Sequence, residues 1–381
     1  MDRRRRAYVA GGAIVGIFLL VQLGALALVE PFKTAGYQPV KNPQNPTNSL
    51  VYVGAILVAT AAMLVALRLD VAWLLRAFIV FSGAYLAFYV FSVLLPDVGW
   101  AVNPLAVAAA GLIGVALYVH PEWYVIDAAG VVMGAGGAAL FGISFGVLPA
   151  LILLVVLAVY DAISVYGTEH MLTLASGVMD LKVPVILVIP LTLSYSFLDA
   201  EPPETASGSA ADDGTAEATA DGAGTTEVEG AGTPSADAAP SEADGPAGEM
   251  ETDIGGGNGD GQAHGESEDT RVTDDSGDGG FDRDAIFIGL GDAVIPTVLV
   301  ASAGFFATGA SLVPGIALTL PALAAMVGTL AGLVVLLWMV LQGRAHAGLP
   351  LLNGGAILGY IAGALAAGIP LVEAVGLAPY L

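Results

Sequence analysis

The residues best suited to chemistry are two aspartates in otherwise apolar sequence. Asp292 closes the tetrapeptide Gly289-Leu290-Gly291-Asp292 inside the apolar run 285–296, and Asp161 follows the largely apolar run 151–160. A carboxylate within a membrane-spanning helix costs roughly 2.5–3.5 kcal/mol on insertion scales, so it usually has a partner or a function. We therefore expect Asp161 and Asp292 to meet and act as one site.

Two carboxylates at close range on neighbouring helices can share one proton, because two buried negative charges repel each other. In aspartic-protease chemistry the ionised carboxylate activates a water molecule, while the protonated one polarises the carbonyl of the peptide bond to be cut. The pair titrates together, so the sequence assigns neither role to Asp161 or to Asp292. The chemistry that this pattern predicts is hydrolysis of a peptide bond within a membrane.

The residues beside the two aspartates are further candidates. Gly289 and Gly291 lack side chains, so a substrate backbone can approach closely, and that substrate must be locally extended to be cut. Isolated glycines would indicate ordinary helix packing, and the sequence 257–260 repeats the Gly-x-Gly-Asp pattern in a polar tract. The motif at 289–292 is therefore a candidate because it lies in a membrane-spanning context, and its spacing alone would not make it one. Tyr160 either hydrogen-bonds to the aspartates or is an interfacial aromatic residue.

A helical membrane protein has to position these residues. Hydrophobic residues make up 56% of the 381 residues and charged residues only 12%, and apolar stretches of about 20 residues recur. At 1.5 Å per residue, Asp161 lies about 24 Å along its helix from the outside and Asp292 about 12 Å along its helix from the inside, so both are expected in the cytoplasmic half of a core roughly 30 Å thick. We expect an all-α polytopic membrane protein with nine transmembrane helices, at about 7–29, 49–67, 71–95, 101–119, 124–141, 145–166, 284–306, 315–341 and 349–372.

The charge of the chain is concentrated in one segment. Most of the acidic residues behind the net charge of −23 lie within 199–283, among small and polar residues that cannot form a core. The chain then divides into an N-terminal helical part (1–198, helices 1–6 with an interfacial extension over 171–197), a disordered acidic loop (199–283) and a C-terminal helical part (284–381, helices 7–9). A flexible loop imposes no geometry on the helices that it joins.

Arginine positions predict the orientation. The cluster Arg3–Arg6 precedes an apolar span longer than the roughly 7–15 apolar residues of a signal peptide, so we expect an uncleaved first helix. Basic residues mark cytoplasmic loops. The chain is therefore expected to be a multi-pass cell-membrane protein with its N-terminus and the 199–283 loop in the cytoplasm.

The sequence favours neither a metal site nor a cofactor. It has no cysteine and no His-Glu-x-x-His, its histidines are scattered, and we expect no nucleic-acid partner. Asp127, near the start of the fifth span, is interpreted as an interfacial or helix-packing acid in preference to a catalytic one. The acidic, lysine-poor composition favours a high-salt organism.

In combination, these motifs resemble the presenilin and signal peptide peptidase family of intramembrane aspartyl proteases. The resemblance rests on Tyr160-Asp161 in one helix, Gly289-Leu290-Gly291-Asp292 in the next after a long loop, and the turn Ala347-Gly348-Leu349-Pro350 before the last helix. The family's third motif is Pro-Ala-Leu, often followed by Pro in presenilins. This chain retains Leu349 and Pro350 and departs at Ala347 and Gly348.

The resemblance implies an intramembrane aspartic endopeptidase with Asp161 and Asp292 as catalytic residues. It also implies that Leu349 and its neighbours, with help from Asn353, pack against the aspartates and hold a substrate strand. Single-span membrane proteins in the lipid bilayer would be the substrates. The cytoplasmic N-terminus is similar to that of presenilins and, with the acidic composition, indicates an archaeal, salt-adapted member. The sequence determines neither partner subunits nor an oligomeric state.

Three other functions use similar residues. An ion- or proton-coupled transporter also contains buried aspartate pairs, but it is typically built from inverted repeats, and no convincing repeat is present. A protease of the prepilin-peptidase type shares Gly-x-Gly-Asp, but it has fewer helices and leaves the Leu349-Pro350 turn unexplained. A substrate-binding homologue without activity would not need both aspartates.

Overall fold

The structure is a computed structural model that describes residues 3–69, 71–167, 186–192, 195–198, 285–342 and 347–380. These residues form an all-α polytopic membrane protein, as predicted. Within them, seven helices are long and apolar enough to cross a membrane, and two more, α4 and α8, are apolar but shorter. These apolar helices are α1 (Arg3–Thr34), α2 (Thr47–Arg68), α3 (Ala72–Leu94), α4 (Pro104–Val119), α5 (Trp123–Ser144), α6 (Val147–Gly167), α8 (Leu290–Phe306), α9 (Leu320–Val340) and α10 (Gly348–Ala366), and they are followed by the short α11 (Leu371–Ala374) and η1 (Ala378–Tyr380).

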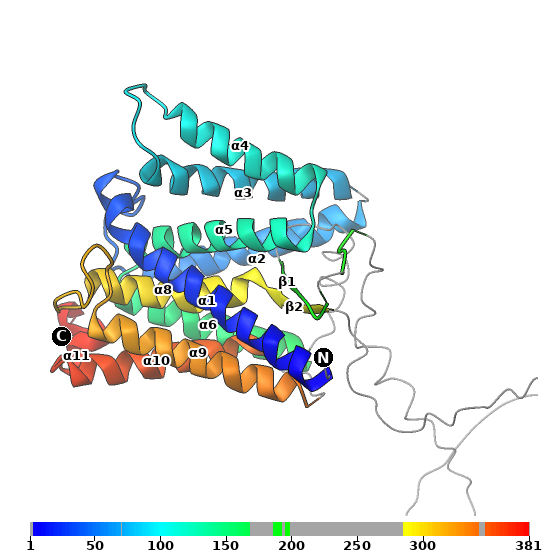
Figure 1. The fold of residues 1–381 in the computed structure, drawn as a ribbon. Helices are drawn as coiled ribbons and strands as arrows, with labels where there is room; N and C mark the ends of the chain where they lie inside the picture. The colour runs from blue at the N-terminus through cyan, green and yellow to red at the C-terminus, as the bar shows by residue number, and fades with distance from the viewer. Residues whose placement is uncertain are drawn as a thin grey trace, which may run out of the picture. The chain divides into compact units, whose positions relative to one another are not determined.

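The helices form a bundle in which α3 and α4 lie on one side, α9 and α10 lie on the other, and α5 and α8 lie between (Figure 1). Of the seven long spans, α5 is the most buried, at 67%. Its small residues allow neighbouring helices to approach closely. A Cβ atom on Gly136 would overlap Val90 of α3, and one on Gly142 would overlap Ala301 of α8. Helix α5 is therefore the packing centre of the bundle.

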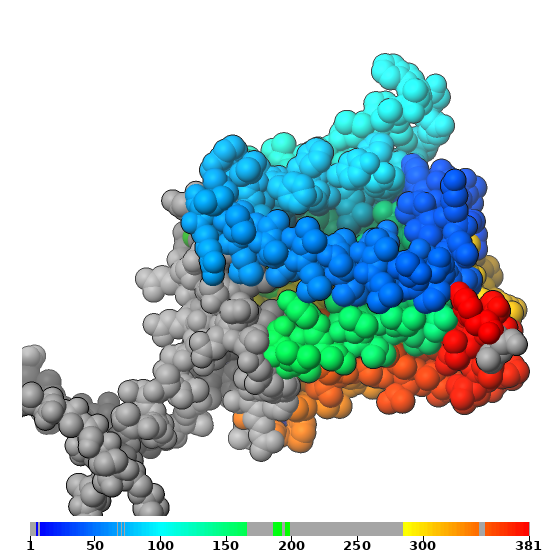
Figure 2. Space-filling view, turned by 180° about the vertical axis from the view of Figure 1, so that it is seen from behind, coloured from blue at the N-terminus to red at the C-terminus, as the bar shows by residue number. Residues whose placement is uncertain are grey.

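Helix α2 is packed far less tightly. Figure 2 shows it lying along the surface above α6, and only 6% of its apolar span is buried in the protein. Its remaining apolar surface has to be covered by lipid, because water would not solvate it.

The α9–α10 pair is held by glycines that remove side chains from the contact. A Cβ atom on Gly328 or Gly332 of α9 would overlap a backbone carbonyl of α10, and a Cβ atom on Gly355 or Gly359 would overlap a backbone carbonyl of α9. Backbone-to-backbone packing of this kind needs small residues at the crossing. It fixes α10, and with it the turn at residues 347–350, against α9.

A two-stranded antiparallel sheet lies at the end of the bundle where α8 begins, and we did not predict it. Strand β1 (Ile186–Pro190) pairs with β2 (Ala285–Gly289). The prediction of a helix from residue 284 was therefore wrong in its first residues, and Asp292 lies in the first turn of α8 and not about 12 Å along a helix. Pairing with β1 satisfies the backbone groups along one edge of Ala285–Gly289, and the β-branched and aromatic side chains of Ile286, Phe287 and Ile288 suit a strand.

Other differences from the predicted elements are smaller. Helix α1 extends through Pro31 to Thr34, where we expected a loop from residue 30. The last predicted helix ends early, at Ala366, because Gly368 adopts a φ of +79° and Pro370 follows it. The predicted acidic loop at 199–283 lies outside the described residues, as does the part of the interfacial extension over 171–185.

Candidate active site

Asp161 lies near the end of α6 and is only 6% exposed. Its Oδ2 accepts a hydrogen bond from the backbone N–H of Leu349 at 3.1 Å. Leu349 is in the first turn of α10, where N–H groups have no partner within the helix. The carboxylate of Asp161 therefore supplies the acceptor that the start of α10 lacks.

Asp292 lies in the first turn of α8, with Gly289 as the N-cap residue. A carboxylate there interacts favourably with the helix dipole and the free N–H groups. Pro296 has no N–H, so the Asp292 carbonyl cannot receive the usual helical hydrogen bond from four residues later. The backbone around Asp292 is therefore less constrained by its own helix than that around Asp161.

The two carboxylates approach each other at the start of α10. A Cβ atom on Gly348 would lie 3.7 Å from Asp292 Oδ2, and the next residue, Leu349, donates to Asp161. The two side chains are near enough for the charge of one to affect the other. Two acids more than 100 positions apart in the sequence thus both lie next to the dipeptide Gly348-Leu349.

The Gly289-Leu290-Gly291 motif has one packed and one open side. Leu290 points into the bundle, where its Cδ1 would lie 3.4 Å from a Cβ atom on Gly134 of α5. A Cβ atom on Gly289 would lie 3.4 Å from Asp292 Oδ2. Gly291 is exposed, and a Cβ atom there would meet nothing within 4 Å. Open space therefore begins at Gly291, one residue before Asp292.

The third motif forms the entry into α10. Ala347 is the buried N-cap residue, and Gly348, Leu349 and Pro350 form the first turn. Proline is tolerated there because its missing N–H would have no helical partner. The contacts to Asp161 and Asp292 come from a backbone N–H and from a position without a side chain, so they do not require the side chains of the Pro-Ala-Leu pattern.

Two predicted site residues have other surroundings. Tyr160 is 38% exposed, and its hydroxyl bonds to no other residue in the described part of the chain, which fits an interfacial aromatic. Asn353, one turn beyond Leu349, is fully buried, and its Nδ2 donates to the Leu154 carbonyl of α6 at 2.9 Å. Asn353 thus ties α10 to the helix of Asp161, a role that the sequence did not predict.

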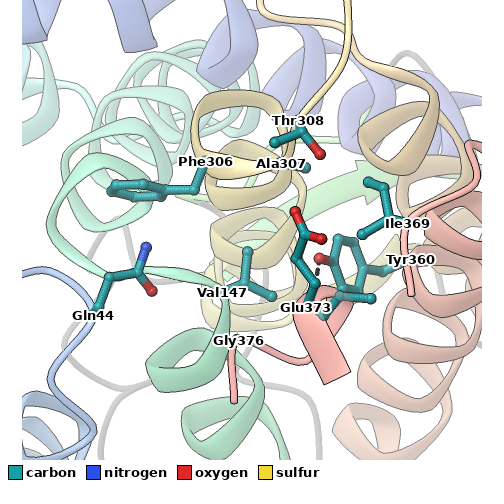
Figure 3. A pocket seen from close by; sticks show the side chains of 10 residues that line it. Gln44, Val147, Phe306, Ala307, Thr308, Tyr360, Ile369, Glu373 and Gly376 are labelled. Atoms are coloured by element: carbon teal, nitrogen blue, oxygen red, sulfur yellow. Dashed lines mark hydrogen bonds between the residues drawn. The ribbon is translucent and has the colours of Figure 1, made fainter. Parts of the chain in front are cut away.

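A pocket of about 70 Å³ lies far from the aspartates. Figure 3 shows Glu373 beside Tyr360 there, with Val147 from the start of α6 and Phe306 from the end of α8 in the lining. Asp161 and Asp292 are each about 21 Å from these helix ends at 1.5 Å per residue. The pocket is thus at the opposite end of the bundle. Among the described residues, no three His, Cys, Asp or Glu side chains are grouped to ligate a metal ion.

Comparisons with known proteins decide the family. The family described as "Signal-peptide peptidase, presenilin aspartyl protease" matches residues 15–221 and 260–369. The chain belongs to this family. The fold is similar to a solved structure of a presenilin family intramembrane aspartate protease in the C222 space group, with 30% identity, coverage of 93% of this chain and 99% of the other, and a TM-score of 0.56. A second such structure, in the P2 space group, has 30% identity, coverage of 93% and 97%, and a TM-score of 0.54. No curated protein matches the chain.

Family membership supports intramembrane aspartic protease activity on transmembrane substrates in a lipid bilayer. It favours a presenilin-like protease over the ion- or proton-coupled transporter that a buried aspartate pair also allows.

Proposed function

We propose that the chain is an intramembrane aspartyl endopeptidase in which Asp161 and Asp292 form the catalytic dyad. The observation that carries the proposal is the contact of the two carboxylates with adjacent residues, Leu349 and Gly348, at the start of α10. Two carboxylates that lie close together can share one proton. The dyad is partly buried, so its electrostatic interactions are stronger than in water.

The shared proton allows the dyad to act as acid and base. The ionised carboxylate takes a proton from water as the water oxygen bonds to the scissile carbonyl carbon, and the protonated carboxylate gives its proton to the carbonyl oxygen. The proton taken from water then passes to the amide nitrogen. The C–N bond breaks, and the hydroxyl proton of the intermediate returns to the dyad. The Leu349 N–H orients Asp161 throughout.

We expect the substrate to be a transmembrane helix that unwinds beside β2. One edge of β2 pairs with β1, and β2 leads directly into the open space at Gly291. An extended peptide can add to a strand edge through backbone hydrogen bonds, and a glycine there allows its backbone to approach. Unwinding also exposes the peptide bond, which a helix would bury under its side chains.

The dyad is proposed to face the cytoplasmic half of the membrane. Helix α1, which begins at Arg3, starts at the same end of the bundle as β1 and β2 (Figure 1). Basic residues near a membrane span favour the cytoplasmic side. The N-terminus and the 199–283 loop would then share the side from which the dyad is reached.

The test is cleavage of a single-span substrate by the purified protein in lipid. Asp161→Ala and Asp292→Ala should each lower the rate by at least about a hundredfold, because one carboxylate cannot supply both proton transfers. A transition-state analogue of aspartyl proteases should inhibit the native chain.

The matched control is Asp97→Ala, which removes an aspartate from an exposed turn between α3 and α4, where it accepts the Gly99 N–H at 2.9 Å. It should cleave at the native rate. Cleavage by either dyad variant, or analogue binding that neither variant changes, would contradict the shared site.

A further inference from the structure

Asp127 lies on α5, outside the dyad, and bonds to the sheet that leads into it. Its Oδ1 accepts a hydrogen bond from the Val188 N–H at 2.8 Å. Val188 is the central residue of β1 and pairs with Phe287 of β2. In an antiparallel pair, alternate residues direct their N–H and C=O groups away from the partner strand. The Val188 N–H therefore points to the outer edge of β1, and Asp127 occupies that edge.

A second acid, at the N-cap of α5, holds the residues beyond β1. Glu122, just before the membrane span, accepts hydrogen bonds from Ser196 Oγ at 2.8 Å and from the Phe197 N–H at 3.0 Å. Burial opposes the ionisation of Glu122, but these bonds outweigh it and lower its pKa. The Phe197 ring in turn contacts Phe287, with 6.3 Å between the ring centroids. Helix α5 thus holds β1 at Val188 and the chain after it at Phe197.

The same helix also contacts the start of the catalytic motif. A Cβ atom on Gly130 of α5 would lie 2.9 Å from Leu187 of β1 and 3.7 Å from Leu290 of α8. Strand β2 ends at Gly289, three residues before Asp292. A shift of β1 relative to α5 would therefore be transmitted through β2 to the residues around Asp292.

We propose that Asp127 is a positioning residue for cleavage, which fixes the β1–β2 sheet through Val188 and so selects the peptide bond that meets the dyad. The proposal rests on the proposed function of Asp161 and Asp292. With the outer edge of β1 occupied by Asp127, an extended substrate has the other edge of β2 to pair with. Register on that edge decides which bond is cut, because a strand places its residues at fixed intervals.

The experiment compares Asp127→Leu, which has no acceptor, with Asp127→Asn, whose amide oxygen can still accept the Val188 N–H. Hydrogen exchange of peptides covering 186–190 and 285–289 is measured in lipid, and the product ends of a single-span substrate are read by mass spectrometry. Asp127→Leu should speed exchange about tenfold and spread cleavage over neighbouring bonds. Asp127→Asn should retain the native exchange rates and the native product ends. Asp97→Leu, the control, should retain them too.

If Asp127→Leu exchanges faster but its product ends are unchanged, the hydrogen bond between Asp127 and Val188 only stabilises the sheet, and the positioning role is overturned. Unchanged exchange, or altered product ends in Asp127→Asn, would overturn it too. If Asp127→Leu does not fold, Val188→Pro removes the donor without breaking the pairing of β1 with β2 and should give the same two changes. Failure of the proposed function is seen separately, as cleavage by Asp161→Ala or Asp292→Ala.

Discussion

At the scale of single residues, the candidate site depends on positions without side chains. Gly348 faces Asp292, and a Cβ atom there would lie 3.7 Å from the carboxylate and 3.3 Å from Leu336 Cδ2. Gly291 faces open space. A side chain at the first position would press on the Asp292 carboxylate, whereas the second position leaves room that a substrate would use.

Gly348 is expected to tolerate alanine but not a larger residue. The flexible end of Leu336 can move by the few tenths of an ångström that a methyl group needs, so Gly348→Ala should cleave within about threefold of the native rate. Gly348→Leu would push against Asp292 and should lower the rate at least about tenfold. Initial cleavage rates on one substrate measure both. Equal rates for the two variants would show that Gly348 does not border the dyad.

Substitutions of Gly291 should lower the cleavage activity without lowering the stability of the fold. Gly291→Ala meets nothing within 4 Å, and alanine favours a helix over glycine by about 0.5–1 kcal/mol, so the melting temperature should hold or rise. Cleavage should nevertheless fall, and fall further in Gly291→Leu, because the side chain occupies the substrate's space. Gly142→Ala is the contrasting variant: its Cβ would overlap Ala301, so it should melt earlier. Native activity in Gly291→Leu would contradict substrate passage there.

At the scale of elements, the sequence predicts the helical architecture and the two acids but not the sheet. Apolar spans of membrane length identify the helices, and a carboxylate within one marks a candidate site. The predicted helix includes Ala285–Gly289 because a short apolar run does not distinguish strand from helix. Its partner, β1, lies within the stretch 171–197, which the sequence predicts to be an interfacial extension. Only tertiary pairing between segments almost 100 residues apart decides the matter.

The α9–α10 crossing supports a test with neighbouring glycines. A Cβ atom on Gly355 would overlap the Gly328 carbonyl, whereas one on Gly354 meets nothing within 4 Å. Gly355→Ala should therefore destabilise the fold by about 1–3 kcal/mol and lower cleavage, since α10 carries the turn at the dyad. Gly354→Ala should leave both unchanged. The melting temperature of both variants is measured in lipid. A larger decrease for Gly354→Ala than for Gly355→Ala would contradict this packing.

Glu122 predicts an acid-sensitive attachment of the residues after β1. Its pKa lies below the ordinary 4.5, so its bonds to Ser196 and Phe197 stabilise the fold above that pH, and the contribution is lost as the pH falls through the lowered pKa. Protection factors for amide exchange in a peptide containing 195–198 should drop over that range. In Glu122→Gln the drop should disappear. An equal drop in protection in Glu122→Gln would mean that another titrating group causes it.

At the scale of the whole molecule, the helices after the acidic loop are held by packing with the first six. Helix α8 packs against α1, α5 and α6, and α10 packs against α6. We propose that 1–198 and 284–381 are two helical parts that the 199–283 segment joins without positioning. The sequence of that segment is too polar to form a core of its own.

Cutting the chain within residues 199–283 should not change its cleavage activity. With a specific protease site inserted near residue 230, digestion of the purified protein should give two fragments that co-elute in detergent and cleave substrate at the uncut rate. The uncut insertion variant is the control. Dissociation of the fragments, or loss of activity after the cut, would mean that the segment positions the helices.

The bond from the Leu349 N–H to Asp161 also bears on how relatives of this chain can be found. A backbone group is present whatever the residue is, provided that a helix begins there and the residue is not proline. Substitutions around residues 347–349 can therefore accumulate while the acid keeps its donor. A search for the string Pro-Ala-Leu would pass over such chains, whereas a search for a helix start two residues before a proline, downstream of two intramembrane acids, would recover them.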